Sequence, residues 1–257
     1  MSKLIFLICQ VNCYQKNDTK DENYKFQIFF LFFFILSCQS EKNSYFPLNA
    51  NISWTYLVEI IPEIESKMVY KKINGTLKEI KVETSQDENP KKLFPILREN
   101  NSIYYYSKSN NGILREGVQY SQGSNISFEK EKRFVLRYPL EVGRGWMSSD
   151  KTFLILRRYP YFDYKATTDF KLNNVVKSLN ETVKVPAGKF KGCLKIEANG
   201  ETTFIGDSEI GTINIKVKTT EWCAPNVGLV KSLRIEETDT DLFGTTKMLQ
   251  VLDQFKS

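Results

Sequence analysis

The stretch Val185-Pro186-Ala187-Gly188-Lys189-Phe190 separates two runs of β-forming residues, Val175 to Val185 and Phe190 to Ala198. Pro186 sets φ for the first central position of a turn, and Gly188 tolerates the left-handed backbone that follows it. The stretch therefore predicts two antiparallel strands joined by a three-residue loop with a glycine bulge.

Runs of this kind, separated by turn residues, continue on both sides of the hairpin. They cover residues 54–60, 68–73, 77–82, 103–106, 113–114, 126–138, 153–157, 212–222, 229–236 and 247–255. Asn74-Gly75 predicts a type I′ hairpin, and Asn110-Asn111-Gly112 predicts a second turn. No stretch keeps a helical period beyond two turns. We expect a mainly β fold, an antiparallel, strongly curled sheet or half-barrel of about ten or more strands with little helix.

A short pattern occurs twice, at Pro47 to Trp54 and at Pro139 to Trp146, as P-L-x-x-[N/G]-x-x-W. Asn and Gly are the residues that best tolerate left-handed backbone, so each copy predicts a tight turn that delivers a buried Trp to the start of a strand. The repetition is consistent with two related halves of one β domain over residues 47–257.

The N-terminal segment has the order of a secretory signal. Ile28 to Leu36 is an uninterrupted apolar run of nine residues, whereas a helix needs about 20 to cross a bilayer. Lys25 precedes the run and Ser37 follows it, which predicts a cleaved signal over residues 1–37. Residues 1–24 would make its first part unusually long and suggest a start codon placed too far upstream. The alternative is a short buried apolar element.

Ile35-Leu36-Ser37-Cys38 resembles the lipobox of bacterial lipoproteins, in the relaxed form found in spirochaetes. The resemblance implies cleavage before Cys38, attachment of diacylglycerol and a further acyl chain such as palmitate, and a lipidated tether over residues 38–46. The protein would then bind a membrane of the bacterial cell envelope through its N-terminal lipid. Gln39, which is not acidic, favours the outer membrane by resemblance to lipoprotein sorting rules.

Three motifs widen the resemblance: P-L-x-x-G-x-x-W at 139–146, V-P-A-G-x-F at 185–190, and W-x-A-P-x-V-G-L-V-K at 222–231. Together they resemble a broad set of uncharacterised exported bacterial proteins. Some of these are similar to the lipoprotein-localisation-factor half-barrel, which implies a concave apolar face. The expected structural turn residues are Pro47, Trp54, Pro139, Trp146, Pro186, Gly188 and Gly228.

Cys193 and Cys223 are the only thiols of the mature chain besides Cys38. If the loop from Gly206 to Gly211 joins their strands, they face each other across a hairpin at a separation compatible with a disulfide. A slip of one residue would place them on opposite faces of the sheet. Two separately buried thiols are therefore the alternative.

The composition excludes several kinds of chemistry. With 0 His in 257 residues, the chain has no His-based triad, no Cys-His dyad and no His-ligated zinc. A net charge of +6 without a basic cluster argues against a nucleic-acid partner. We expect no cofactor and no metal. Carboxylates alone could hydrolyse a glycan if two of them converged; the candidates are Asp163, Asp169, Glu181, Glu197 and Glu221.

Two further clusters have a functional and a structural interpretation. Tyr159, Tyr161 and Tyr164 follow two arginines and are candidate ligand contacts, or side chains of a half-buried edge strand. The acidic run 237–241 is similar to the start of a calcium loop, but it has Leu242 where the motif requires Gly and Met248 where it requires Glu. A solvated turn is the better interpretation of that run.

These observations predict a non-enzymatic, membrane-anchored envelope lipoprotein. Its β domain would bind an amphiphile or an envelope protein partner, or serve structurally. The alternative is a carboxylate-dependent envelope hydrolase that acts on glycan.

Overall fold

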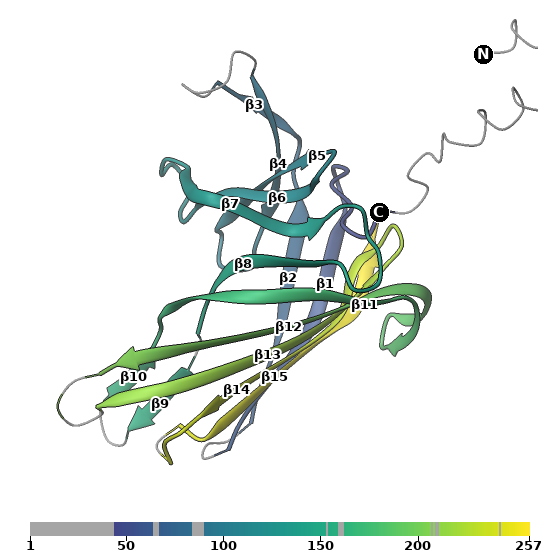
Figure 1. The fold of residues 1–257 in the computed structure, drawn as a ribbon. Helices are drawn as coiled ribbons and strands as arrows, with labels where there is room; N and C mark the ends of the chain where they lie inside the picture. Colours follow the sequence, from purple (N-terminus) through teal and green to yellow (C-terminus); the bar gives the residue numbers. More distant parts are fainter. Residues whose placement is uncertain are drawn as a thin grey trace, which may run out of the picture. The chain divides into compact units, whose positions relative to one another are not determined.

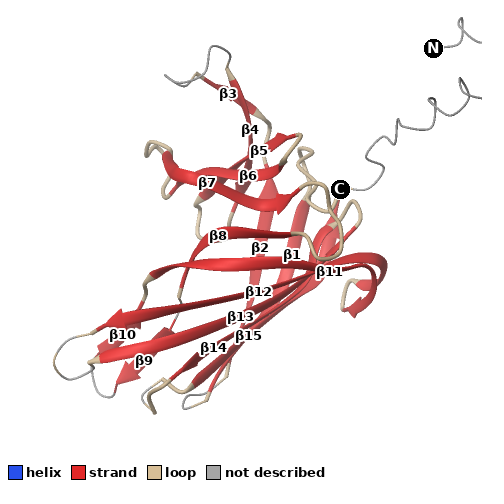
Figure 2. Ribbon diagram, viewed as in Figure 1, coloured by secondary structure: helices blue, strands red, loops and turns tan. Residues whose placement is uncertain are grey.

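The computed structural model describes residues 44–63, 67–83, 90–152, 154–158, 162–206, 208, 211–241 and 243–257. The chain divides into two units, Met1–Lys42 and Asn43–Ser257. All described residues belong to the second unit, so the signal segment and Cys38 lie outside them. This part of the chain is built from strands and connecting loops (Figure 2). Across the described ranges, no helix is long and apolar enough to cross a membrane.

Thirteen of the fifteen described strands form one antiparallel sheet. Along the sheet the order is β7-β6-β5-β4-β2-β1-β15-β14-β13-β12-β11-β8; β3 pairs with β4, and β9 and β10 form a separate pair. The strands are β1 (Ser53–Pro62), β2 (Met68–Thr76), β3 (Ile80–Val82), β4 (Lys91–Leu97), β5 (Ile103–Ser109), β6 (Gly112–Gln119), β7 (Ser127–Arg137), β8 (Gly145–Lys151), β9 (Leu154–Arg158), β10 (Phe162–Ala166), β11 (Asp169–Val185), β12 (Gly188–Ile205), β13 (Thr212–Ala224), β14 (Gly228–Thr238) and β15 (Thr245–Lys256).

The sheet curls until its two edge strands, β7 and β8, lie side by side (Figure 1). They are joined by side chains. Trp146 Nε1 on β8 donates a hydrogen bond to the Phe134 carbonyl on β7 at 3.3 Å, and Arg133 pairs with Asp150 at 3.5 Å. The expected antiparallel, strongly curled sheet is confirmed, and it is nearly closed.

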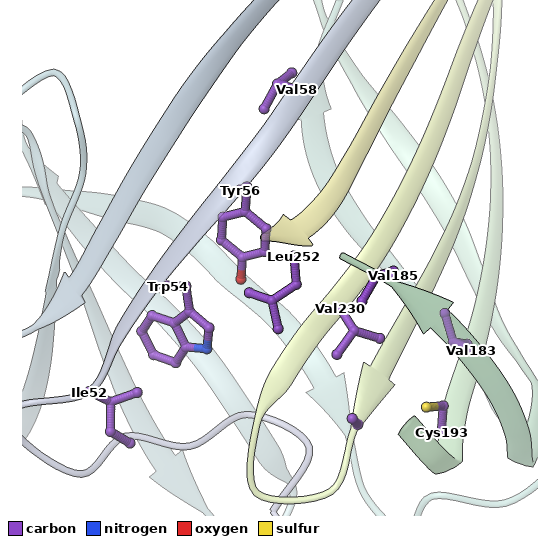
Figure 3. Packing of buried hydrophobic residues seen from close by; sticks show 10 residues of the cluster. Ile52, Trp54, Tyr56, Val58, Val183, Val185, Cys193, Val230 and Leu252 are labelled. Carbon is purple, nitrogen blue, oxygen red and sulfur yellow. The ribbon is translucent and has the colours of Figure 1, made fainter. Parts of the chain in front are cut away.

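The hairpin between β11 and β12 is tighter than expected. Val185 pairs with Gly188, so the loop consists of Pro186 and Ala187 only, and Gly188 has φ +135°. Register shifts along β11 bend the end of this hairpin, as bulges do. Val183, Val185 and Cys193 thereby join the buried cluster around β1 (Figure 3).

The predicted hairpin at Asn74-Gly75 is wrong. Strand β2 continues through both residues, and Asn74 lies opposite Trp54 on β1. Thr76 extends the pairing further, since its N–H donates to the Ile52 carbonyl at 2.8 Å and its hydroxyl accepts from the Ile52 N–H at 2.8 Å. Long-range pairing with β1 therefore outweighs the local turn preference of Asn-Gly.

Both copies of the P-L-x-x-[N/G]-x-x-W pattern form turns of similar design. Asn51 has φ 66° and Gly143 has φ 87°, and the Trp that follows each turn is the second residue of a strand. Trp54 is 5% and Trp146 7% exposed. Each indole N–H donates to a backbone carbonyl, which satisfies the polar end of a buried ring.

The first of these turns meets the turn before β14. Gly228 has φ +87°, and a Cβ placed there would lie 3.1 Å from Cδ of Pro47. Trp54 Nε1 donates to the Val227 carbonyl at 2.6 Å. The close approach and the left-handed backbone both favour glycine at position 228.

The structure corrects the disulfide expectation, because both thiols are free and buried. Leu194, not Cys193, lies opposite Cys223. This offset of one residue places the two cysteines on opposite faces of the sheet. Cys193 packs in the cluster with Val183, and Cys223 in the cluster with Leu194.

Residues 44–46, which the sequence assigns to the tether, pack on the β domain. Ser44 and Asn226 exchange hydrogen bonds through the Ser44 N–H and carbonyl. The Tyr45 hydroxyl donates to the Gly192 carbonyl at 3.1 Å, and the Phe46 ring lies 4.9 Å from that of Tyr106. The packed domain therefore includes residues 44–46.

Candidate functional site

Three neighbouring strands place a row of polar side chains on the concave face of the sheet. Glu221 on β13 lies opposite Ser232 on β14, which lies opposite Gln250 on β15. Residues directly opposite in an antiparallel sheet have Cβ atoms about 5 Å apart, so the three side chains are neighbours. The row is bounded by Ile196 and Val58, and this polar interruption of an apolar lining requires an explanation.

A cavity of about 250 Å³ lies on one side of this polar row; we call it cavity A. Its walls come from β1, β2, β4, β5, β13, β14 and β15 and from the segment before β1. The lining residues are Phe46, Pro47, Trp54, Tyr56, Lys72, Asn74, Ile96, Arg98, Tyr106, Glu221, Gly228, Leu229, Ser232 and Gln250.

A second cavity of about 240 Å³, cavity B, lies towards the edge strands β7 and β8. Glu221, Ser232 and Gln250 line both cavities, so the polar row stands between them. The remaining lining of cavity B is Arg133, Phe134, Val135, Ser148, Asp150, Leu172, Asn174, Thr219, Arg234 and Met248.

Lys72 brings a positive charge into cavity A. Its ammonium donates to Gln250 Oε1 at 3.2 Å, which is a neutral partner. Burial, and secondarily the nearby Arg98 guanidinium, lower the pKa of Lys72 from 10.5 to about 8. A lysine held this way keeps its proton at neutral pH at a cost in folding free energy.

Glu221 brings a carboxyl group to the same space. The group faces the cavities but is enclosed by protein, and burial raises its pKa, with a further contribution from Asp150. Arg234 and Lys72 act in the opposite direction on this pKa. Glu221 makes no hydrogen bond or ion pair with the side chains that the structure describes, so it remains available to a molecule in either cavity.

Asn74 adds an unsatisfied acceptor. Its side chain is 7% exposed and lines cavity A, yet Oδ1 has no hydrogen-bond partner among the described residues. A buried polar atom left in this state costs about 1–3 kcal/mol. The position therefore suits a hydrogen-bond donor brought by a ligand.

Aromatic side chains of β1 lie beside Lys72 and Asn74, with which they are paired across the strands, and they are held rigidly. The Tyr56 hydroxyl donates to the Leu229 carbonyl at 3.1 Å, and burial raises the pKa of this phenol. Trp54 is held by its bond to Val227. Figure 3 shows both rings projecting from β1 beside Leu252.

Apart from Glu221, the charged side chains that line cavity B are paired with one another or with neighbouring residues. Arg234 donates to Asp150 at 2.6 Å, to Glu236 at 2.7 Å and to the Lys151 carbonyl at 2.7 Å. Arg133 also pairs with Asp150. These bonds run from β14 to β8 and from β7 to β8, so the network ties the two edge strands to the middle of the sheet.

The candidate carboxylates do not converge. Glu221 lines both cavities, whereas Asp169 pairs with Lys151 at 3.2 Å in an exposed position and Glu197 pairs with Lys195 at 2.8 Å in a half-buried one. Glu181 lies opposite Cys193. Asp163 lies on β10, in a stretch whose side chains are not described.

The other candidate site residues lie at the surface or outside the residues whose side chains the structure describes. Tyr164 is on β10, where the backbone alone is described, and Cys38, Tyr159 and Tyr161 lie outside the described residues. In the acidic run, Asp239 accepts hydrogen bonds from the Asn214 side chain at 2.7 Å and backbone at 2.9 Å. The described ranges hold no cluster of three or more metal-ligating side chains.

Sequence reasoning missed Lys72, Asn74, Arg98, Asp150 and Arg234. Lys72 and Asn74 alternate along β2 and so share one face, but a turn expected at Asn74 concealed this alternation. The concave apolar face that the resemblance implied also needs correction, since the interior carries charged and amide groups at its centre.

Residues 164–246 match the DUF3108-like family. The matched segment includes Glu221, Ser232 and Arg234. Among solved structures, that of a candidate lipoprotein from Parabacteroides distasonis aligns with 84% of this chain and 100% of its own, at 15% identity and a TM-score of 0.37. No curated protein matches the chain. Neither similarity assigns a ligand or an activity to this protein.

Proposed function

We propose that this protein is a lipid-anchored protein of the bacterial cell envelope whose β domain binds a small ligand inside the curled sheet, without catalysing a reaction. The anchor rests on the lipobox-like Ile35 to Cys38. The binding role rests on cavity A. A membrane is the expected partner of the N-terminal lipid, and the outer membrane the expected location.

One observation carries the binding role: cavity A contains polar groups that the described residues leave incompletely satisfied. Lys72 meets a neutral amide, Glu221 has no partner, and Asn74 Oδ1 has none. Each of these groups destabilises the empty domain. Perturbed titratable groups gathered in a cavity are typical of functional sites.

Binding is favoured over glycan hydrolysis because the two carboxylates that share cavity B are not equivalent. Asp150 is paired with Arg234 and Arg133. Among the described residues that line cavity B, Glu221 therefore has no unpaired carboxylate with which to form a catalytic pair. Glycosidases need two, about 5–9.5 Å apart, one of them free to take up or deliver a proton.

Ligand binding is tested by thermal denaturation of the full chain with a library of small polar and amphiphilic molecules. We expect a subset to raise the melting temperature of the wild type, because ligands that bind only the folded state stabilise it. Asn74→Leu should reduce that rise, while Asn214→Leu, an exposed surface change, should not. Failure of every class of molecule to stabilise the wild type would contradict a binding role.

The anchor is tested by labelling cells with radioactive palmitate. The wild type and Cys193→Ala should incorporate label, whereas Cys38→Ala should incorporate none. Fractionation of the labelled envelope then assigns the membrane. Equal labelling of the wild type and Cys38→Ala would exclude the proposed anchor.

A further inference from the structure

The charges that line cavity A are predominantly positive. Lys72 and Arg98 both line it, and neither forms a salt bridge with a described carboxylate. Arg98 lies over the Tyr104 ring, with Cζ 4.9 Å from the ring centre. Glu221, the single carboxylate among the lining residues, is driven by burial towards its neutral form. The cavity therefore offers more positive than negative charge to a guest.

The uncharged residues that line cavity A indicate the chemistry of the rest of a ligand. Trp54, Ile96, Tyr106 and Leu229 supply an apolar surface, and Phe46 packs on Tyr106. Asn74 Oδ1 is an acceptor without a donor. At about 250 Å³, the cavity is smaller than the 300–1,000 Å³ or so typical of pockets for drug-sized ligands, so the guest is compact.

We propose, building on the binding role above, that cavity A takes a compact organic oxyanion: a carboxylate or phosphate held by Lys72 and Arg98, attached to an apolar body that carries a hydroxyl or amino donor for Asn74. Hydrogen bonds between ionised partners are the strongest available to such a ligand. The anion also neutralises a buried lysine whose described hydrogen-bond partner is the neutral Gln250 amide, and the donor satisfies the unpaired Asn74 acceptor.

Isothermal titration calorimetry of the full chain with four probes tests this assignment. 3-(4-Hydroxyphenyl)propionate carries the anion and the donor, 3-phenylpropionate the anion only, and 3-(4-hydroxyphenyl)propan-1-ol the donor only. 2-(4-Hydroxyphenyl)ethyl phosphate replaces the carboxylate by phosphate. We expect the first and last to bind, and the neutral alcohol to bind at least about tenfold more weakly than the matching acid. The tighter of the two anions identifies the preferred headgroup.

Matched variants distinguish loss of the Lys72 charge from a general loss of folding. Lys72→Met should weaken binding of the hydroxy acid about tenfold or more, and it removes a buried charge, so it folds at least as well as the wild type. Lys71→Met is the control, since Lys71 is the next residue on β2, faces outward and is 64% exposed in its pair with Asp253. Asn74→Leu should remove the advantage of the hydroxy acid over 3-phenylpropionate.

Proton uptake gives an independent readout. The groups that act on the Lys72 ammonium are Arg98, Glu99 and Glu221. Bound anion should raise the pKa of Lys72 from about 8, so wild-type affinity should fall between pH 7 and 10. Lys72→Met should lack this fall.

Three results would overturn the assignment. If the neutral alcohol binds as tightly as the acid, or Lys72→Met binds the acid as the wild type does, the oxyanion site is wrong while a ligand-binding role stands. If no probe binds and no library molecule stabilises the wild type, both the oxyanion site and the binding role are wrong.

Discussion

Lys71 and Lys72 are adjacent in β2 but have opposite environments, because successive side chains of a strand point to opposite faces. Lys71 reaches solvent beside Asp253, whereas Lys72 enters cavity A and meets only Gln250. The same alternation brings Asn74 inward. At the scale of single residues, the site consists of polar groups placed where a stable fold would have apolar ones.

Replacing Lys72 by Met should stabilise the domain at neutral pH. Folding lowers the pKa of Lys72 from 10.5 to about 8, so the unfolded state binds the proton more tightly. This difference in proton affinity destabilises the folded state by about 3 kcal/mol at pH 7. This loss is fully present below pH 8, shrinks as the pH rises and disappears above about pH 10.5, where neither state holds the proton.

Urea unfolding of the wild type and Lys72→Met between pH 7 and pH 10 measures this effect. The gain from the substitution should shrink steadily as the pH rises. Lys71→Met should show no such trend. A difference that stays constant with pH would mean that Lys72 is not perturbed by burial.

Glu221→Gln tests the second buried charge. Burial raises the pKa of Glu221 above 4.5, so ionisation destabilises the fold above that pH and the destabilisation is lost on acidification. We expect the variant to melt at a higher temperature than the wild type at pH 7 and at the same temperature below pH 4. Glu197→Gln, at a half-buried ion pair outside the cavities, is the control. A lower melting temperature at pH 7 would mean that Glu221 has a stabilising partner.

At the scale of elements, the seam between β7 and β8 closes the sheet. Backbone pairing holds every other neighbouring pair along the described sheet, whereas this seam depends on Trp146, on Arg133 with Asp150, and on Arg234 reaching across from β14. Edge strands without a ladder are the parts of a sheet that open most readily. The seam also borders cavity B.

Asp150→Asn should loosen this seam. The substitution removes the carboxylate that Arg133 contacts and one of the two that Arg234 contacts, Glu236 being the other. Because these arginine side chains are only 21% and 11% exposed, we expect a cost of about 2 kcal/mol or more. Hydrogen exchange of β7 and β8 amides should accelerate more than that of β12 and β13. Asp169→Asn, at a carboxylate that is 76% exposed, should change the unfolding free energy by less than about 0.5 kcal/mol. Unchanged exchange in β7 and β8 would contradict the role of Asp150.

At the scale of the whole molecule, cavity A is assembled from distant parts of the chain. Lys72 comes from β2, Arg98 follows β4, and Glu221 and Gln250 come from β13 and β15. The concave face holds them together because the sheet curls through strands β1, β2 and β13 to β15. Within the described residues the domain has no covalent cross-link, since Cys193 and Cys223 are free.

The native domain should therefore be indifferent to reductant. Cys193 is 0% and Cys223 6% exposed, and burial raises the pKa of both thiols, so alkylating reagents should modify them only after unfolding. Peptide mass spectrometry before and after denaturation measures this, with melting curves in the presence and absence of reductant. A peptide linking the two cysteines under non-reducing conditions would contradict the register of β12 and β13.

The sequence alone was sufficient for the β class of the fold, because strand composition and turn residues are local properties. The alternation of β runs predicted most of the strands, and Pro186 with Gly188 located the longest hairpin. The expectations that were wrong concerned which residues pair with each other across strands. Asn74-Gly75 has the composition of a turn but lies in a strand, because β1 pairs with it. Cys193 and Cys223 differ from the expected register by one residue, which no local signal specifies.

Only the tertiary structure decided where the site lies. Among the carboxylates that the sequence proposed, Glu221 reached the cavities, while Lys72 and Arg98 carried no signal of their own, since a lysine or arginine in a strand is usually solvated. Their common location follows from strand order and from the curvature of the sheet. These arise from contacts between residues far apart in the chain, so the physical reason for the fold class is local and the reason for the site is not.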